Sequence, residues 1–380
     1  MILSMSNSRT WLRNISAVLV LLLLGNSAFA LLADNRSEKR IVATTEIVPN
    51  YLLHLFVVGE VWKDHNMDNP EYRSVYSRFV RQEDIDYIRD HRKFLEWGNG
   101  NSGVLTPLLF FLPTRTGSID DKAKLEQYLT LAKATFKDKS AFSRFNSAYP
   151  EMAVPDAVIE MFWKSKDSYQ DVFFQMADIL LRNFDSYAQN VWPLERAKLD
   201  RTASLLDQKF KGSHCIEKWE EFVQTKFPAE HFEIVLTTAN KGLPSANDLA
   251  PNRYNFYFSP EDMDSLVDLI HHEIGTNLLR ESRSMLEQDS GLCRVKVRNV
   301  RCDAVLWRAF ESLAEFYKEK VLSSSRKAWT GTAYDGKAYD FPIFFKVYDA
   351  EYDKNPHLPP GEMMRRGIER FLSLQEGDVK

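Results

Sequence analysis

The feature that most constrains the fold is a change of pattern near Phe227. Upstream, apolar residues recur at helical spacing, most clearly in Tyr169–Gln189. Downstream, His231–Thr238 alternates like a strand, and Tyr254–Phe258 forms a second, aromatic strand-like run. We therefore expect a helix-rich α+β protein in which these two strands form a small antiparallel sheet. The expected divisions are a leader (1–30), a mostly helical region (31–227) and a mixed region (228–380).

The first 30 residues have the composition of a secretory signal peptide. Arg9 and Arg13 precede the apolar run Ile15–Leu24, and small residues then lead to Ala30. We expect cleavage after Ala30 and a secreted or periplasmic protein. The apolar run is shorter than the ~20 residues of a membrane span, so an uncleaved anchor is the alternative and no later span is expected.

The charge balance argues against nucleic acid as a partner. The chain has 49 Lys and Arg against 53 Asp and Glu, a formal charge of −4, and loss of Arg9 and Arg13 with the leader would make it −6. Phosphate binding requires a basic surface, which this composition does not favour.

A helix is expected immediately after the aromatic strand. Ser259 is a favourable N-cap, Pro260 suits the first helical position, and acidic residues follow, so the helix should run from there to about Arg280. It contains His271, His272 and Glu273. One turn beyond His272 lies Thr276, followed by Asn277.

A second helix with paired acidic residues is expected downstream. Glu311 and Glu315 lie one turn apart within Arg308–Tyr317, opposite an apolar face. Asp303 is placed to cap this helix. Glu311 follows His272 by 39 positions in the sequence.

This order of strand, helix and second helix resembles the zincin metallopeptidases of the gluzincin type, over about a quarter of the chain. In that family H-E-x-x-H supplies two zinc-binding histidines and a glutamate that activates water. The resemblance implies zinc ligands at His272 and Glu311, and Glu273 as the catalytic base. It also implies that an edge strand, here Tyr254, Phe256 and Phe258, pairs with a peptide substrate.

The motif departs from the family pattern because Thr276 replaces the second histidine. Asn277 and His271 are the local substitutes for that ligand, and an amide oxygen is a poor one. Asn277 would require the helix to loosen at Gly275, since it is rotated about 140° from His272. The zinc site is therefore expected to be degenerate, or else completed by an unusual ligand.

Two interpretations of function follow. The first is an exported metallopeptidase-like protein that acts on or binds peptides or envelope proteins, with Zn²⁺ as its cofactor. The second is a non-catalytic peptide-binding or scaffolding protein. A simpler alternative also stands, in which His271, His272 and Glu273 are polar residues beside the apolar face of their helix. Glu311 and Glu315 would then form a solvated face of the second helix.

Three cysteines remain after the leader. The run between Cys293 and Cys302 alternates apolar and basic residues as a hairpin would, which favours a disulfide between them. Cys215 would then be unpaired, with His214 beside it as a candidate metal or base residue. The alternative is three reduced thiols.

Overall fold

The computed structural model describes residues 39–63, 67–98, 101–240, 245–258, 262–289, 292, 302–322 and 341–377. The leader, and the predictions that concern it, lie outside these residues. The described chain is a helix-rich α+β fold, as expected from its sequence. No helix within these ranges is long and apolar enough to cross a membrane.

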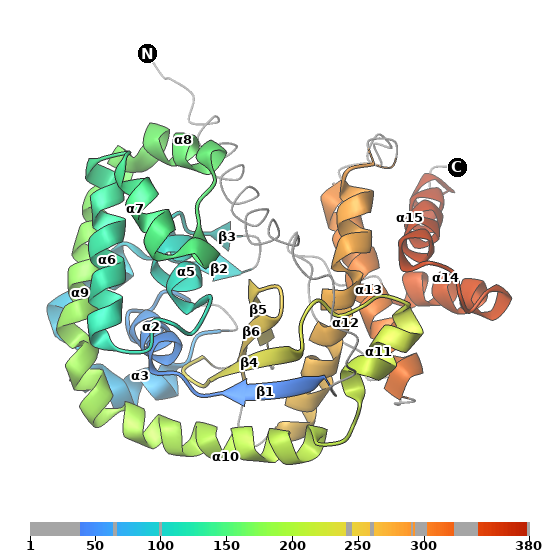
Figure 1. Ribbon diagram of the computed structural model, residues 1–380, viewed down its shortest axis with the longest axis horizontal. Helices are drawn as coiled ribbons and strands as arrows, with labels where there is room; N and C mark the ends of the chain where they lie inside the picture. The colour runs from blue at the N-terminus through green and yellow to red at the C-terminus, as the bar shows by residue number, and fades with distance from the viewer. Residues whose placement is uncertain are drawn as a thin grey trace.

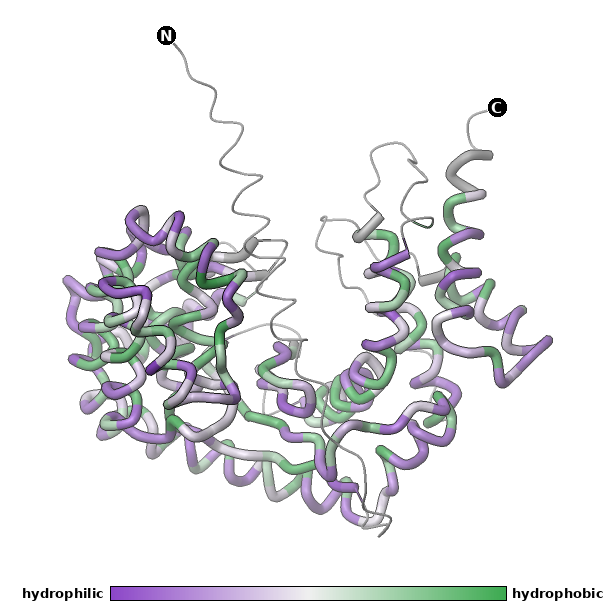
Figure 2. The backbone as a smooth tube through the Cα atoms, turned by 45° about the horizontal axis from the view of Figure 1, so that its top comes forward, coloured by the Kyte–Doolittle hydropathy of each residue, from purple (hydrophilic) through white to green (hydrophobic). Residues whose placement is uncertain are grey.

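The first helical group packs around a core made mainly of residues 48–191. Helix α2 is almost completely buried at its centre because its sequence is apolar on every side. Figure 2 shows the hydrophobic segments of this group gathered in its interior. Its helices are α2 (Ile47–Val58), α3 (Pro70–Tyr76), α4 (Gln82–Asp90), α5 (Leu112–Thr114), α6 (Lys122–Lys137), α7 (Ala141–Ala148), α8 (Asp156–Ser165) and α9 (Gln170–Asn190).

The central sheet is mixed, with strand order β1-β4-β6-β5. Strands β1, β4 and β6 are parallel, and β5 is antiparallel to β6. The strands are β1 (Arg40–Thr44), β4 (His231–Thr237), β5 (Ser245–Ala250) and β6 (Arg253–Tyr257). A separate two-stranded ribbon joins β2 (Trp97–Gly98) to β3 (Asn101–Ser102).

The expected antiparallel pairing of the two predicted strands, β4 and β6, is wrong. The segment between them, rich in Gly, Pro and Asn, contains β5, so the chain reverses twice and β6 returns parallel to β4. The sheet separates two hydrophobic cores. Ile234 and Leu236 of β4 point into the C-terminal core, while Val235 between them points into the N-terminal one.

The second helical group covers the other side of the sheet, as Figure 1 shows. Helix α10 runs along the sheet beside β1 and links the two groups. The C-terminal core draws on residues 199–371 together with Ile41 of β1. The helices of this part are α10 (Trp192–Phe210), α11 (Cys215–Val223), α12 (Met263–Glu287), α13 (Cys302–Leu322), α14 (Phe341–Lys354) and α15 (Pro360–Gly377).

The start of α12 differs from expectation. Its N-cap is Asp262, whose side chain accepts a hydrogen bond from the Ser265 backbone, rather than Ser259. The helix then continues without interruption to Glu287. Helix α13 includes Asp303 within its first turn, so Asp303 is not the residue preceding the helix.

Candidate functional site

The candidate site is centred on His272, which is completely buried between α12 and α13. Its Nε2 atom lies 2.9 Å from Glu311 Oε2, and its Nδ1 atom lies 3.2 Å from Glu315 Oε2. The close approach of His272 and Glu311 is therefore confirmed. Glu315 was expected only to share a face with Glu311, and it instead binds the opposite edge of the imidazole ring.

The charges around His272 compensate one another. Burial acts to lower its pKa, but the hydrogen bonds to Glu311 and Glu315 outweigh burial and raise the pKa of His272 to about 9. Lys318 lies 2.8 Å from Glu315 and 2.7 Å from Asp268. Although burial raises the pKa of Glu315, its contacts with His272 and Lys318 lower it overall. These contacts consequently favour the protonated form of the His272 ring.

Glu273 lies on the neighbouring part of α12. Loss of solvation raises the pKa of Glu273 to about 7, assisted by the negative charge of Glu311 and opposed by the positive charge of His272. The Thr276 hydroxyl lies 2.9 Å from the Glu273 carboxylate and 3.0 Å from its backbone carbonyl. A carboxyl group with this pKa can exchange a proton near neutrality, which is the property required of a general base.

Gly275 does not distort α12, so the loosening that Asn277 would require in order to reach a metal with His272 is absent. A Cβ atom at this position would meet the Trp219 ring of α11, with 2.5 Å to the nearest carbon. The missing side chain therefore allows α11 to pack closely against α12. Because the helix stays regular, Asn277 remains rotated away from His272, and its amide donates to the Pro251 carbonyl.

His271 has a partner that sequence reasoning missed. Its Nδ1 atom lies 3.1 Å from the sulfur of Cys215, the first residue of α11. Burial raises the pKa of Cys215 to about 12 and lowers that of His271 to about 4, so the pair is a neutral thiol and a neutral imidazole. His214, the neighbour singled out in the sequence, is the left-handed residue that precedes α11. Cys293 lies outside the described residues, so the predicted disulfide with Cys302 stays a prediction.

The prediction that Tyr254, Phe256 and Phe258 form an exposed substrate-binding edge is wrong. Strand β6 lies between β4 and β5, and all three side chains are buried in the C-terminal core. The reason is again the unforeseen strand β5, which occupies the edge. Strand β5 also carries an irregularity between Asp248 and Ala250, a feature common at sheet edges.

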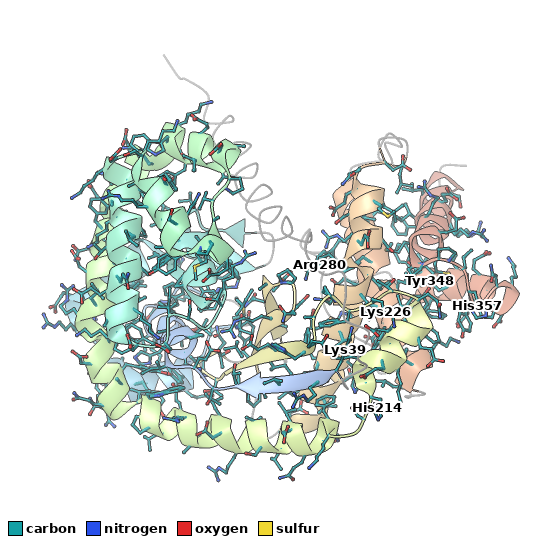
Figure 3. The ribbon with its side chains drawn as sticks, in the orientation of Figure 1. Lys39, His214, Lys226, Arg280, Tyr348 and His357 are labelled. Atoms are coloured by element: carbon teal, nitrogen blue, oxygen red, sulfur yellow. The ribbon has the colours of Figure 1, made fainter. Side chains whose placement is uncertain are left out.

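An ion pair connects this edge strand to α12. Arg280 lies 2.6 Å from Asp248 of β5 and donates to the Tyr254 hydroxyl at 2.6 Å. Figure 3 shows Arg280 on α12 beside the hairpin of β5 and β6. The side chains of Asp248 and Glu273 are near enough for their charges to interact. The charged groups of β5 and of α12 near Glu273 therefore interact with one another.

The residues present do not complete a zinc site. One aspect fits, because a zinc-bound histidine commonly donates its second nitrogen to a carboxylate, as His272 does to Glu315. A zinc ion needs at least three protein ligands, however, and only His272 and Glu311 converge. Thr276 is hydrogen-bonded to Glu273, and His271 faces Cys215. Within the described ranges no group of three or more His, Cys, Asp or Glu side chains is arranged to hold a metal ion.

Comparisons of the chain with protein-family models, with curated proteins and with solved structures find no match.

Proposed function

We propose that this chain is an exported protein of zincin ancestry that has lost its hydrolytic metal centre and binds extended peptide or protein segments along β5. The order of β6, α12 and α13 agrees with the resemblance stated from the sequence. The strand at this edge of the sheet is β5, in place of the predicted one. An edge strand offers unpaired backbone groups to an incoming strand.

The single observation that carries the loss of hydrolysis is the engagement of both His272 nitrogens by carboxylates. A protonated ring that donates from Nδ1 to Glu315 and from Nε2 to Glu311 offers no lone pair, so a metal would have to displace the Nε2 proton and its hydrogen bond to Glu311. The two carboxylates lie on opposite edges of the ring, so Glu315 does not add a second carboxylate ligand beside Glu311. In this proposal His272, Glu311 and Glu315 form a buried, salt-bridged cluster where the metal was once bound, and this cluster joins α12 to α13.

An active metallopeptidase is the second candidate, and one observation favours it. Glu273, with a pKa of about 7, lies beside the pair of His272 and Glu311, which is the placement a water-activating base requires. In this alternative a further ligand, beyond His272 and Glu311, completes the site. The two candidates differ in metal content and in hydrolysis.

The deciding experiment measures zinc retained by the purified mature protein after dialysis, together with hydrolysis of an unstructured peptide mixture. We expect substoichiometric zinc and no hydrolysis, because two converging ligands bind zinc weakly. Stoichiometric zinc with hydrolysis that is lost in Glu273→Gln would establish the active enzyme instead.

Restoring the missing imidazole tests the ancestry separately. We expect Thr276→His to raise zinc affinity, since position 276 lies one turn beyond His272 on the same face of α12. Asn277→His is the matched variant, because it places the same ring at the other candidate position. If neither variant binds zinc more tightly than the unmodified protein, the zincin ancestry is contradicted.

A further inference from the structure

An arginine without a partner lies near the edge strand. Arg115 follows α5, and its side chain is buried, with 7% of the residue exposed. Within the described part of the chain, its guanidinium makes no hydrogen bond or ion pair. Arg253, which is also buried, is by contrast held by Glu46 at 2.6 Å and Glu233 at 2.5 Å.

Backbone contacts fix the turn that carries Arg115 against the β5–β6 hairpin. The preceding carbonyl, of Thr114, accepts a hydrogen bond from Arg253 Nε at 3.0 Å. Arg253 is the first residue of β6 and pairs in register with Ala250 of β5. Gly117, two residues beyond Arg115, lies against the side chains of Arg253 and Glu46. Arg115 is therefore attached to a rigid support beside the hairpin.

One of the charges that act on Arg115 belongs to the edge strand. Burial lowers its pKa, and the negative charges of Asp248 and Glu151 oppose that effect without forming an ion pair with it. Asp248 is already paired with Arg280. Asp248 thus interacts with both Arg280 and Arg115 but forms an ion pair only with Arg280. Among the described residues, Arg115 has no ion-pair partner.

We propose that Arg115 binds a carboxylate of the extended segment that pairs with β5. The guanidinium is largely removed from water and has no ion-pair partner among the described residues, while its nitrogen atoms keep some contact with solvent. A carboxylate supplied by a ligand would compensate its charge through charge-assisted, bidentate hydrogen bonds. The carboxylate comes from the carboxyl terminus of the segment or from an acidic side chain within it. This inference rests on the proposed function, of which it specifies the ligand class.

The test uses one six-residue peptide of Ala, Val and Thr with a fluorescent label at its N-terminus, in three forms. The first has a free C-terminal carboxylate, the second a C-terminal amide, and the third an amide with one internal Glu. We expect the carboxylate forms to bind the mature protein roughly 10- to 100-fold more tightly than the neutral amide. The form that binds more tightly identifies the source of the carboxylate.

Arg115→Gln should abolish this preference, and Arg81→Gln, at an exposed position, should preserve it. Binding of all three forms with equal affinity, or a preference that survives in Arg115→Gln, would overturn the inference and leave the proposed function intact. Failure of every form to bind would contradict the proposed function.

If no form of the peptide binds, a measurement without peptide still tests whether Arg115 binds a carboxylate. Acetate alone should raise the thermal midpoint of the unmodified protein but not that of Arg115→Gln, with chloride at equal ionic strength as the reference. Arg115→Gln should itself melt at a higher temperature than the unmodified protein, because it removes an unpaired buried charge. No effect of acetate, or a lower midpoint in Arg115→Gln, would show that Arg115 is structural.

Discussion

At the scale of single residues, His54 is the clearest example of a buried group that constrains stability. Its Nδ1 atom lies 3.0 Å from the Tyr72 oxygen, and the Tyr72 hydroxyl donates to Glu195 at 2.6 Å. Nδ1 must therefore carry the proton and donate a hydrogen bond to the Tyr72 oxygen. Its Nε2 atom has no hydrogen-bond partner within the described residues. Burial accordingly lowers the pKa of His54 to about 3, from an ordinary value near 6.5.

This shift predicts a loss of stability in acid. Between pH 6.5 and about 3 the unfolded chain binds a proton at His54 that the folded chain does not, so the free energy of unfolding rises with pH across this window. One such proton contributes up to about 1.4 kcal/mol per pH unit. We expect His54→Gln to flatten the dependence between pH 4.5 and 6.5, measured by urea unfolding. An unchanged slope would mean that His54 is not the responsible group.

The sequence predicted one half of the candidate site and not the other. His272 and Glu311 could be paired because a family pattern relates their positions. The pairing of Cys215 with His271 had no such signal, since it depends on how closely α11 approaches α12. That approach is set by Gly275 and Trp219, a contact between residues far apart in the chain. Local spacing carries no information on contacts of this kind.

At the scale of elements, the packing of α11 on α12 leads to a prediction about Gly275. Alanine is ordinarily favoured over glycine inside a helix by about 1 kcal/mol. Here the added methyl group would overlap the Trp219 ring, so we expect Gly275→Ala to lower the free energy of unfolding by about 1–3 kcal/mol. Denaturant unfolding measures the change.

Gly361 of α15 provides the matched control. A Cβ atom there would have its nearest neighbour at 3.8 Å, an ordinary van der Waals contact. Gly361→Ala should leave stability unchanged or raise it slightly. Equal effects of the two substitutions would contradict the proposed role of Gly275.

Helices were predicted from the sequence more accurately than the sheet. The helical run Tyr169–Gln189 nearly coincides with α9, because helical periodicity is a local property. The positions of β4 and β6 were also close to expectation. Their direction was not, because it depends on whether the segment between them contains another strand. Strand β1 was missed entirely, since its only partner lies in the second half of the chain.

At the scale of the whole molecule, the sheet makes the two helical groups dependent on each other. Neighbouring residues of β4 serve different cores, with Ile234 in one and Val235 in the other. Arg253 of β6 adds ionic contacts to Glu46, immediately before α2, and to Glu233 of β4. Damage to either core is therefore transmitted through the sheet to the other.

We expect the described chain to unfold in one cooperative transition. Ile234→Ala should lower the free energy of unfolding by about 2–5 kcal/mol, and Val235→Ala by a smaller amount, without splitting the transition. Hydrogen exchange followed by mass spectrometry can monitor α2 and α12 separately. Loss of protection in only one of these helices in either variant would show that the groups unfold independently.

The position of β1 in the chain also determines how long it waits for its partner strand during synthesis. β1 begins at Arg40, whereas its parallel partner β4 begins only at His231. At about 5–20 residues per second, the ribosome needs roughly 10–40 s to make that intervening stretch. The first helical group is nearly complete by then, whereas β1 has no neighbour to pair with during the whole interval. During that interval β1 is a strand without its partner, and premature pairing with another strand is a route to misfolding.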